Sequence, residues 1–123
     1  MGESEFVERM AKLRERFASK LAGKIQETEA AAGHLAGGGI DAVDAVAAAY
    51  RRFHDICGIG PTIGFKATGQ AARTLDGLLI GPFRDHRGLS ADELAKLKEG
   101  LELLRSAARI EIQSAESNQE LAR

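Results

Sequence analysis

Apolar residues recur at steps of three and four along most of the chain, which is the spacing of one face of an α-helix. The first such row ends in an alanine-rich run to Leu35. Its members are Phe6, Met10, Leu13, Phe17, Leu21 and Ile25. The row predicts one long helix or two consecutive helices, with Ser19 and Gly23 as the places where it would bend. Gly37-Gly38-Gly39 should end it, because glycine forfeits ~1 kcal/mol of helix propensity relative to alanine.

A second helical pattern starts near Asp41, which is the candidate N-cap, and contains His54. Its apolar row consists of Val46, Ala49, Phe53, Ile56 and Ile63. At roughly 100° per residue, His54 lies about a third of a turn from the centre of this row, so we expect it to flank the buried seam. A competing row would instead enclose His54, and periodicity alone leaves this alternative open. That row consists of Val43, Ala47, Tyr50 and Cys57.

A third helix is predicted from about Lys66 to Ile80. Pro61 and Gly64 provide the turn before it, and Gly81-Pro82 should stop it. Its predicted apolar row consists of Ala67, Ala71, Leu75, Leu78 and Leu79. A polar row of Gly69, Arg73 and Asp76 lies to one side of this apolar row. It is displaced to the same extent as His54 is displaced from the apolar row of the second helix. We therefore expect the two polar rows to meet at one rim of an antiparallel helix pair.

The fourth helix has the clearest start, because Ser90 and Glu93 form a capping box ahead of another apolar row. That row consists of Leu94, Leu97, Leu101, Leu104, Ala108 and Ile112. The polar tail at about 115–123 lacks an apolar pattern and should fray. Together the patterns predict an all-α fold, an antiparallel up-down four-helix bundle with an extra or bent N-terminal helical segment. We expect a single domain over residues 1–123, with its core at about 17–114.

Composition narrows the possible classes of function. The chain has 123 residues, no Trp, one Tyr and 28% charged residues, which favours one helical domain over a sheet protein. Its formal net charge of −1 gives no general attraction to nucleic acid or anionic membranes. A single cysteine excludes an internal disulfide and leaves too few thiols for a structural zinc site. No apolar stretch approaches the roughly 18 residues that span a bilayer, so we expect a cytoplasmic protein without a membrane partner.

The candidate chemistry lies in the segment 53–65, where His54 is followed by three glycines, Gly58, Gly60 and Gly64. Gly58 is the fourth residue after His54 and therefore lies on the same helical face. Glycine is used where another backbone must come close. We expect the three glycines to give a foreign surface access to the imidazole.

This pattern, His-x-x-x-Gly-x-Gly-x-x-x-Gly, resembles the phosphoacceptor segment of histidine-containing phosphotransfer (Hpt) domains, the relay modules of bacterial and plant two-component signalling. The resemblance covers roughly residues 17 to 114. It implies that His54 carries a phosphoryl group and that Ile56 faces the core. Asp76 falls where the family has a carboxylate or amide partner for the histidine. Cys57 departs from the family, which usually has Lys or Arg there to screen phosphate charge.

The resemblance implies a phosphorelay intermediate. His54 would accept a phosphoryl group from a receiver aspartyl phosphate, or from a kinase, and pass it to another receiver. Asp76 would accept a hydrogen bond from Nδ1–H and leave Nε2 free to attack. The candidates for screening phosphate charge are Arg51, Lys66 and Arg73.

The expected partners are response-regulator receiver domains, and a sensor histidine kinase is a further candidate. The chain has no Walker-type loop, so we expect no ATP use and no enzyme activity of its own. No cofactor is expected either, because the implied Mg²⁺ would be supplied by the receiver.

Four other interpretations remain. Cys57 paired with His54 would make a thiol nucleophile, but no orienting third residue is evident. His54 and Cys57 with His34 would make a metal site, but only two of the three have useful spacing, so no metal is predicted. The bundle would otherwise be a non-catalytic docking module in which His54 is incidental. Asp55 directly after His54 suggests the dimerising helix of a sensor kinase, but the glycine run does not fit that class.

Overall fold

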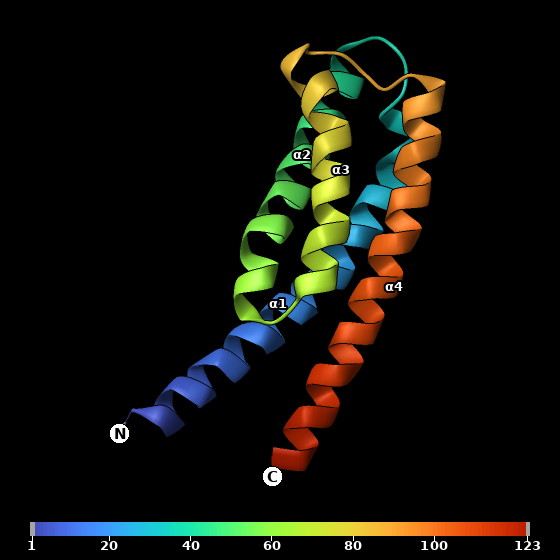
Figure 1. Cartoon of the computed structure of the whole chain (residues 1–123). Helices are drawn as coiled ribbons and strands as arrows, with labels where there is room; N and C mark the ends of the chain where they lie inside the picture. Colours follow the sequence, from blue (N-terminus) through green and yellow to red (C-terminus); the bar gives the residue numbers. More distant parts are fainter. Residues whose placement is uncertain (1, 123) are drawn as a thin grey trace.

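The computed structural model describes residues 2–122, and the side chains of residues 2–117. Its helices are α1 (Glu3–Ala31), α2 (Ile40–Ile59), α3 (Lys66–Arg84) and α4 (Ala91–Ala122), with short 3₁₀ helices η1 (Ala32–His34) and η2 (Gly60–Ile63). Successive long helices run in opposite directions, with α2 and α3 side by side (Figure 1). The described residues form no strand. The predicted all-α four-helix bundle is therefore confirmed.

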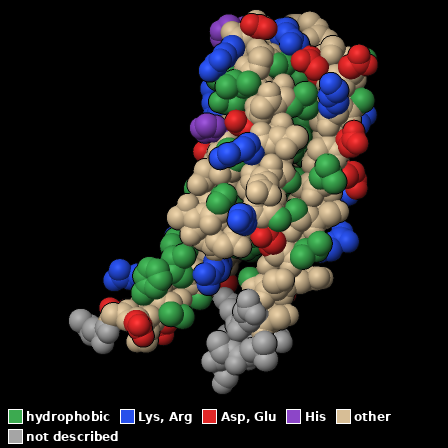
Figure 2. All heavy atoms as spheres, in the orientation of Figure 1, with side chains coloured by type: hydrophobic (Ala, Val, Ile, Leu, Met, Phe, Trp, Pro, Cys, Tyr) green, Lys and Arg blue, Asp and Glu red, His purple; other side chains and the backbone are tan. Residues whose placement is uncertain are grey.

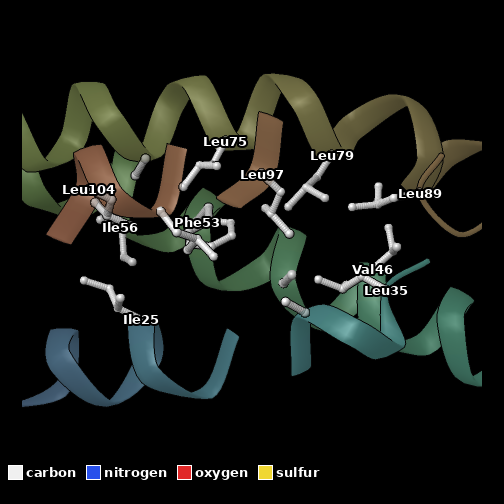
Figure 3. Close-up of a cluster of buried hydrophobic side chains, with 14 of the residues drawn as sticks. Ile25, Leu35, Val46, Phe53, Ile56, Leu75, Leu79, Leu89, Leu97 and Leu104 are labelled. Carbon is white, nitrogen blue, oxygen red and sulfur yellow. The ribbon is translucent and has the colours of Figure 1, made fainter. Parts of the chain in front are cut away.

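The core lies between the four helices, and the side chains at its centre point toward one another (Figure 3). Its fully buried large side chains include Leu21, Val46, Phe53, Ile56, Leu75, Leu79, Leu97 and Leu104. Burying one such side chain contributes about 1.5–3 kcal/mol. All five residues of the predicted α2–η2 seam are buried, whereas the competing row is only partly buried. The structure thus decides the alternative that periodicity left open.

The start of α3 differs from its predicted apolar row. Ala67 is exposed and Thr68 is buried. The cause lies on α4, where the Glu111 carboxylate accepts hydrogen bonds from the Thr68 amide and hydroxyl, both at 2.6 Å, and from the Ala67 amide at 3.2 Å. These contacts satisfy amides that a helix start leaves without partners. A partner on another helix thereby sets which face of the first turn is buried.

The prediction that Gly81-Pro82 stops the third helix is wrong, because α3 continues to Arg84. Proline removes one amide donor, but only two helical residues follow Pro82, so little of the hydrogen-bond ladder is lost. The Phe83 ring stacks on Tyr50 of α2 with centroids 4.5 Å apart. This contact and the buried Pro82 favour about one further turn of helix beyond the predicted end at Ile80.

The predicted capping residue is wrong for α2, whereas the predicted capping box is right for α4. Asp41 is not the N-cap of α2, which begins at Ile40 after Gly39 and has no side-chain cap. At α4 the capping box is present. The Glu93 amide donates to Ser90 Oγ at 3.2 Å, and the Ser90 amide donates to the Glu93 carboxylate at 2.9 Å. Arg87 also contacts Glu93, and these hydrogen bonds lower the pKa of Glu93 to about 2.

The N-terminal turns of α1 extend beyond the bundle (Figure 1). Phe6 and Val7 are 64% and 61% exposed, and the first buried residue of the helix is Leu21. Neither Ser19 nor Gly23 interrupts this helix. The predicted extra N-terminal segment is thus the first part of one long helix.

At the other end, helical backbone in α4 continues past Ser114 to Ala122, and Arg123 lies outside the described residues. Fraying of this tail stays a prediction. In the face shown in Figure 2, basic and acidic side chains lie among one another, which agrees with the small net charge. Of the helices described, none combines the length and the apolar character that crossing a membrane requires.

Candidate functional site

His54 lies at the rim between α2 and α3. Its side chain is 62% exposed, whereas Phe53 beside it in sequence and Ile56 are fully buried. A step of one residue turns a helix by about 100°, which is enough to move a side chain from the core to the surface. Neighbours in the core therefore fix the backbone that presents the imidazole.

Asp76 of α3 faces this imidazole. Its Oδ1 lies 3.1 Å from His54 Nδ1, and its side chain is only 18% exposed. Because α2 and α3 are antiparallel, residues 22 positions apart in sequence meet across the rim. With the proton on Nδ1, the ring donates to the carboxylate and leaves a lone pair on Nε2. The predicted contact between His54 and Asp76 is confirmed.

Tyr50 completes the surroundings of the imidazole. Its ring stacks on His54 with centroids 5.5 Å apart and an interplanar angle of 26°. On its other side Tyr50 stacks on Phe83. The sequence interpretation gave Tyr50 no site role, although its position four residues before His54 places both on one helical face. The stack restricts the orientation of the ring, and the i, i+4 spacing was the signal for it.

Cys57 lies one turn after His54, and its Sγ donates to the His54 carbonyl oxygen at 3.3 Å. Burial raises the pKa of the Cys57 thiol, and the Asp76 charge raises it further, while Arg73 opposes the shift. The thiol therefore keeps its proton at neutral pH. A protonated thiol is a weak nucleophile, so the structure adds nothing to the interpretation of Cys57 as a nucleophile.

The three glycines have different surroundings. Gly58 is exposed, and a Cβ placed there would meet no atom within 4 Å. Gly60 is buried, and a Cβ there would lie 3.1 Å from the Phe65 carbonyl oxygen. Gly64 has φ +98°, a left-handed conformation that suits glycine in the turn into α3. Close packing therefore explains Gly60 and backbone conformation explains Gly64. Nothing in the packing requires glycine at position 58, and its role in access to the imidazole stays a prediction.

The three candidates for screening phosphate charge lie at different distances from the site. Arg51 precedes His54 by about one turn of α2, and Arg73 precedes Asp76 by about one turn of α3; both are exposed. Because the helices are antiparallel, these two arginines flank the site from opposite ends. From Lys66 to Asp76 the helix rises about 15 Å, farther than a lysine side chain spans. The predicted contribution of Lys66 is therefore not supported by its position.

The structure also changes the set of potential metal ligands. One ligand atom each from His54, Cys57 and Asp76 lies within 4.8 Å of the other two. The third ligand considered from the sequence, His34, is not part of this group. Asp76 comes from a different helix, so the spacing of residues along α2 did not reveal it.

Comparison of the chain with protein-family models, curated proteins and solved structures gives no match. Arguments about function therefore rest on the geometry around His54 and on the sequence pattern that contains it.

Proposed function

We propose that this protein is a phosphorelay intermediate. His54 accepts a phosphoryl group from the aspartyl phosphate of a receiver domain, or from a histidine kinase, and passes it to another receiver. The observation that carries the proposal is the exposed imidazole whose Nδ1 lies 3.1 Å from the Asp76 carboxylate. The Hpt-like pattern of His54 and Gly58 points to the same function.

In this mechanism the Nε2 lone pair attacks the phosphorus in line with the bond to the donor aspartate. A phosphorus–nitrogen bond forms, the phosphorus–oxygen bond breaks, and its electron pair leaves with the receiver's carboxylate. The proton on Nδ1 stays in place, so the ring gains positive charge during the transfer. Asp76 stabilises that charge because its carboxylate is already oriented toward Nδ1. Transfer to the next receiver is the reverse of these steps.

The surroundings supply positioning, which is the main contribution a protein makes to phosphoryl transfer. Tyr50 restricts the ring through the stack described above. Arg51 and Arg73 carry positive charge on either side of the phosphoryl group. The Mg²⁺ that this chemistry needs is supplied by the receiver, so the chain requires no cofactor of its own.

The direct test is incubation with a radiolabelled, phosphorylated receiver. Wild-type protein should gain an acid-labile label, and His54→Gln should gain none while keeping its helical circular dichroism. His34→Gln and His86→Gln are matched controls that should label as the wild type does. Label on the His54→Gln variant would overturn the proposal. Failure of the wild type to accept label from a broad panel of receivers and kinases would favour the docking module.

A second test concerns the surface on which the receiver docks. Gly58→Glu places a bulky anion one turn after His54, where a Cβ meets open space. We expect a folded variant that is blocked in transfer. Transfer at the wild-type rate would show that the receiver approaches along another face.

A further inference from the structure

We propose that His54, Cys57 and Asp76 also form a binding site for a single divalent transition-metal cation, with Zn²⁺ as the best match. Imidazole nitrogen, thiolate sulfur and carboxylate oxygen are the three ligand types that zinc takes from proteins. Here one of each type is presented at a single point on the surface. The mixture disfavours Mg²⁺ and Ca²⁺, which prefer sites made entirely of oxygen ligands.

The spacing of the three ligand atoms fits one ion. Tetrahedral zinc with bonds of 2.0–2.3 Å needs its ligand atoms about 3.3 to 3.6 Å apart. The Nδ1 and Oδ1 atoms are 3.1 Å apart, and the whole set lies within 4.8 Å. Small side-chain rotations therefore bring the three atoms onto one ion, without movement of the backbone.

The ligands stand on two packed helices, with two from α2 and one from α3. His54 is already oriented by Asp76 and by the Tyr50 stack, so binding immobilises little that is free beforehand. The exposed imidazole leaves the fourth coordination position open to water. This arrangement predicts a reversible site that is weaker than a closed four-ligand structural site.

Two features oppose binding. The Cys57 thiol must release its proton to become a ligand, so binding of the cation is coupled to proton release. Arg73 precedes the ligand Asp76 by about one turn of α3, and its positive charge there repels a cation. Arg73→Ala should therefore tighten metal binding. Removing a ligand should instead weaken metal binding, so the two kinds of substitution change the metal affinity in opposite directions.

The consequence for signalling rests on the proposed relay function. An ion bound at Nδ1 takes the place of the proton shared with Asp76, and it withdraws electron density from the ring that must attack phosphorus. The ion also occupies the Asp76 carboxylate that would stabilise charge during transfer. Metal binding and phosphoryl uptake thus compete for two of the three ligands, His54 and Asp76.

The first experiment titrates the unphosphorylated chain with Co²⁺, a spectroscopic substitute for zinc, and then displaces it with Zn²⁺. We expect one equivalent to bind with a thiolate-to-cobalt charge-transfer band. Cys57→Ser should remove the band, and Asp76→Asn should weaken binding at least about tenfold, the minimum typical of losing a group that supports a metal site. His34→Gln is the control and should bind as the wild type does. Absence of the band, or its survival in Cys57→Ser, would overturn the proposal.

The second experiment measures phosphoryl uptake from one receiver with and without Zn²⁺. The rate without Zn²⁺ divided by the rate with Zn²⁺ should be at least about ten for the wild type and close to one for Cys57→Ser. The same receiver is present in all of these reactions, so an effect of zinc on the receiver would change the ratio for both proteins alike. Equal ratios above one would show that zinc acts on the receiver, and ratios close to one for both proteins would show that zinc does not affect uptake. Either result would overturn the regulatory role. If the wild type takes up no label even without metal, the relay function fails, while the cobalt titration still decides the metal site.

Discussion

Two faces of α2 have different roles, and adjacent residues of the helix lie on each of them. Phe53 is fully buried in the core, whereas the neighbouring His54 is 62% exposed and contacts Asp76. Stability therefore depends on the first face, and the proposed chemistry depends on the second. If this division holds, substitutions on the two faces should affect different measurements.

The largest expected effect on stability follows from Phe53→Ala. Removing a fully buried phenyl ring leaves a cavity and should lower the free energy of unfolding by about 3–5 kcal/mol. His54→Gln should change it by no more than about 1 kcal/mol, because the His54–Asp76 pair lies at an exposed rim where solvent weakens its contribution to folding. Urea denaturation of both variants measures the difference. Equal losses in the two variants would show that the faces are not separate.

The next effect concerns the hydrogen bond across the rim. Asp76→Asn should slow phosphoryl uptake about ten- to a hundredfold, because one hydrogen bond to a charged group is worth about 1.5–3 kcal/mol. Some transfer should remain, since Nε2 is still present. Asp55→Asn removes an exposed carboxylate next to His54 in sequence and is the matched control. A rate in Asp76→Asn equal to that of Asp55→Asn would exclude the orienting role.

A pair of glycines extends the comparison to backbone positions. Gly60→Ala should destabilise the fold by about 1–3 kcal/mol, because its Cβ would lie 3.1 Å from the Phe65 carbonyl oxygen in a packed region. Gly58→Ala should instead stabilise it by up to ~1 kcal/mol, since the position is helical and open. Thermal unfolding followed by circular dichroism distinguishes the two. Stabilisation by both substitutions would mean that Gly60 is not held by packing.

The smallest expected effect concerns the charge near Cys57. Arg73→Ala should slow phosphoryl uptake by up to about fivefold, the range of an exposed charge pair worth 0.2–1 kcal/mol. Lys66→Ala should have no effect, because Lys66 lies about 15 Å along α3 from Asp76. Cys57→Lys introduces the cation that the resemblance to Hpt domains implies at this position, and it should rescue Arg73→Ala. Wild-type rates in both alanine variants would make Cys57 a packing residue in a weakly screened site.

Much of the fold was determined by local patterns in the sequence. The seam of Val46, Phe53 and Ile56 follows from 3–4 spacing, because helical geometry puts such residues on one face whatever they pack against. The capping box of Ser90 and Glu93 is likewise local. The contact of His54 with Asp76 was predictable because two polar rows, displaced alike from their seams, must meet in an antiparallel pair.

Other features were decided by contacts between residues far apart in sequence. Thr68 is buried because Glu111 on α4 binds its amide and hydroxyl, and no pattern within α3 contains that partner. In the same way, the Phe83 contact with Tyr50 favours helix beyond the proline that was expected to end it.

Some features of the candidate site also followed from the sequence, whereas others depended on the tertiary structure. The sequence determined that His54 flanks a buried seam and that Gly58 shares its face, because both depend only on helical periodicity. Only the tertiary structure decided that Gly60 is held by packing and that the Cys57 thiol lies close enough to the His54–Asp76 pair for the three to form one group of potential metal ligands. The physical reason is that periodicity specifies the direction of a side chain from its own helix, whereas its neighbours depend on how the helices pack.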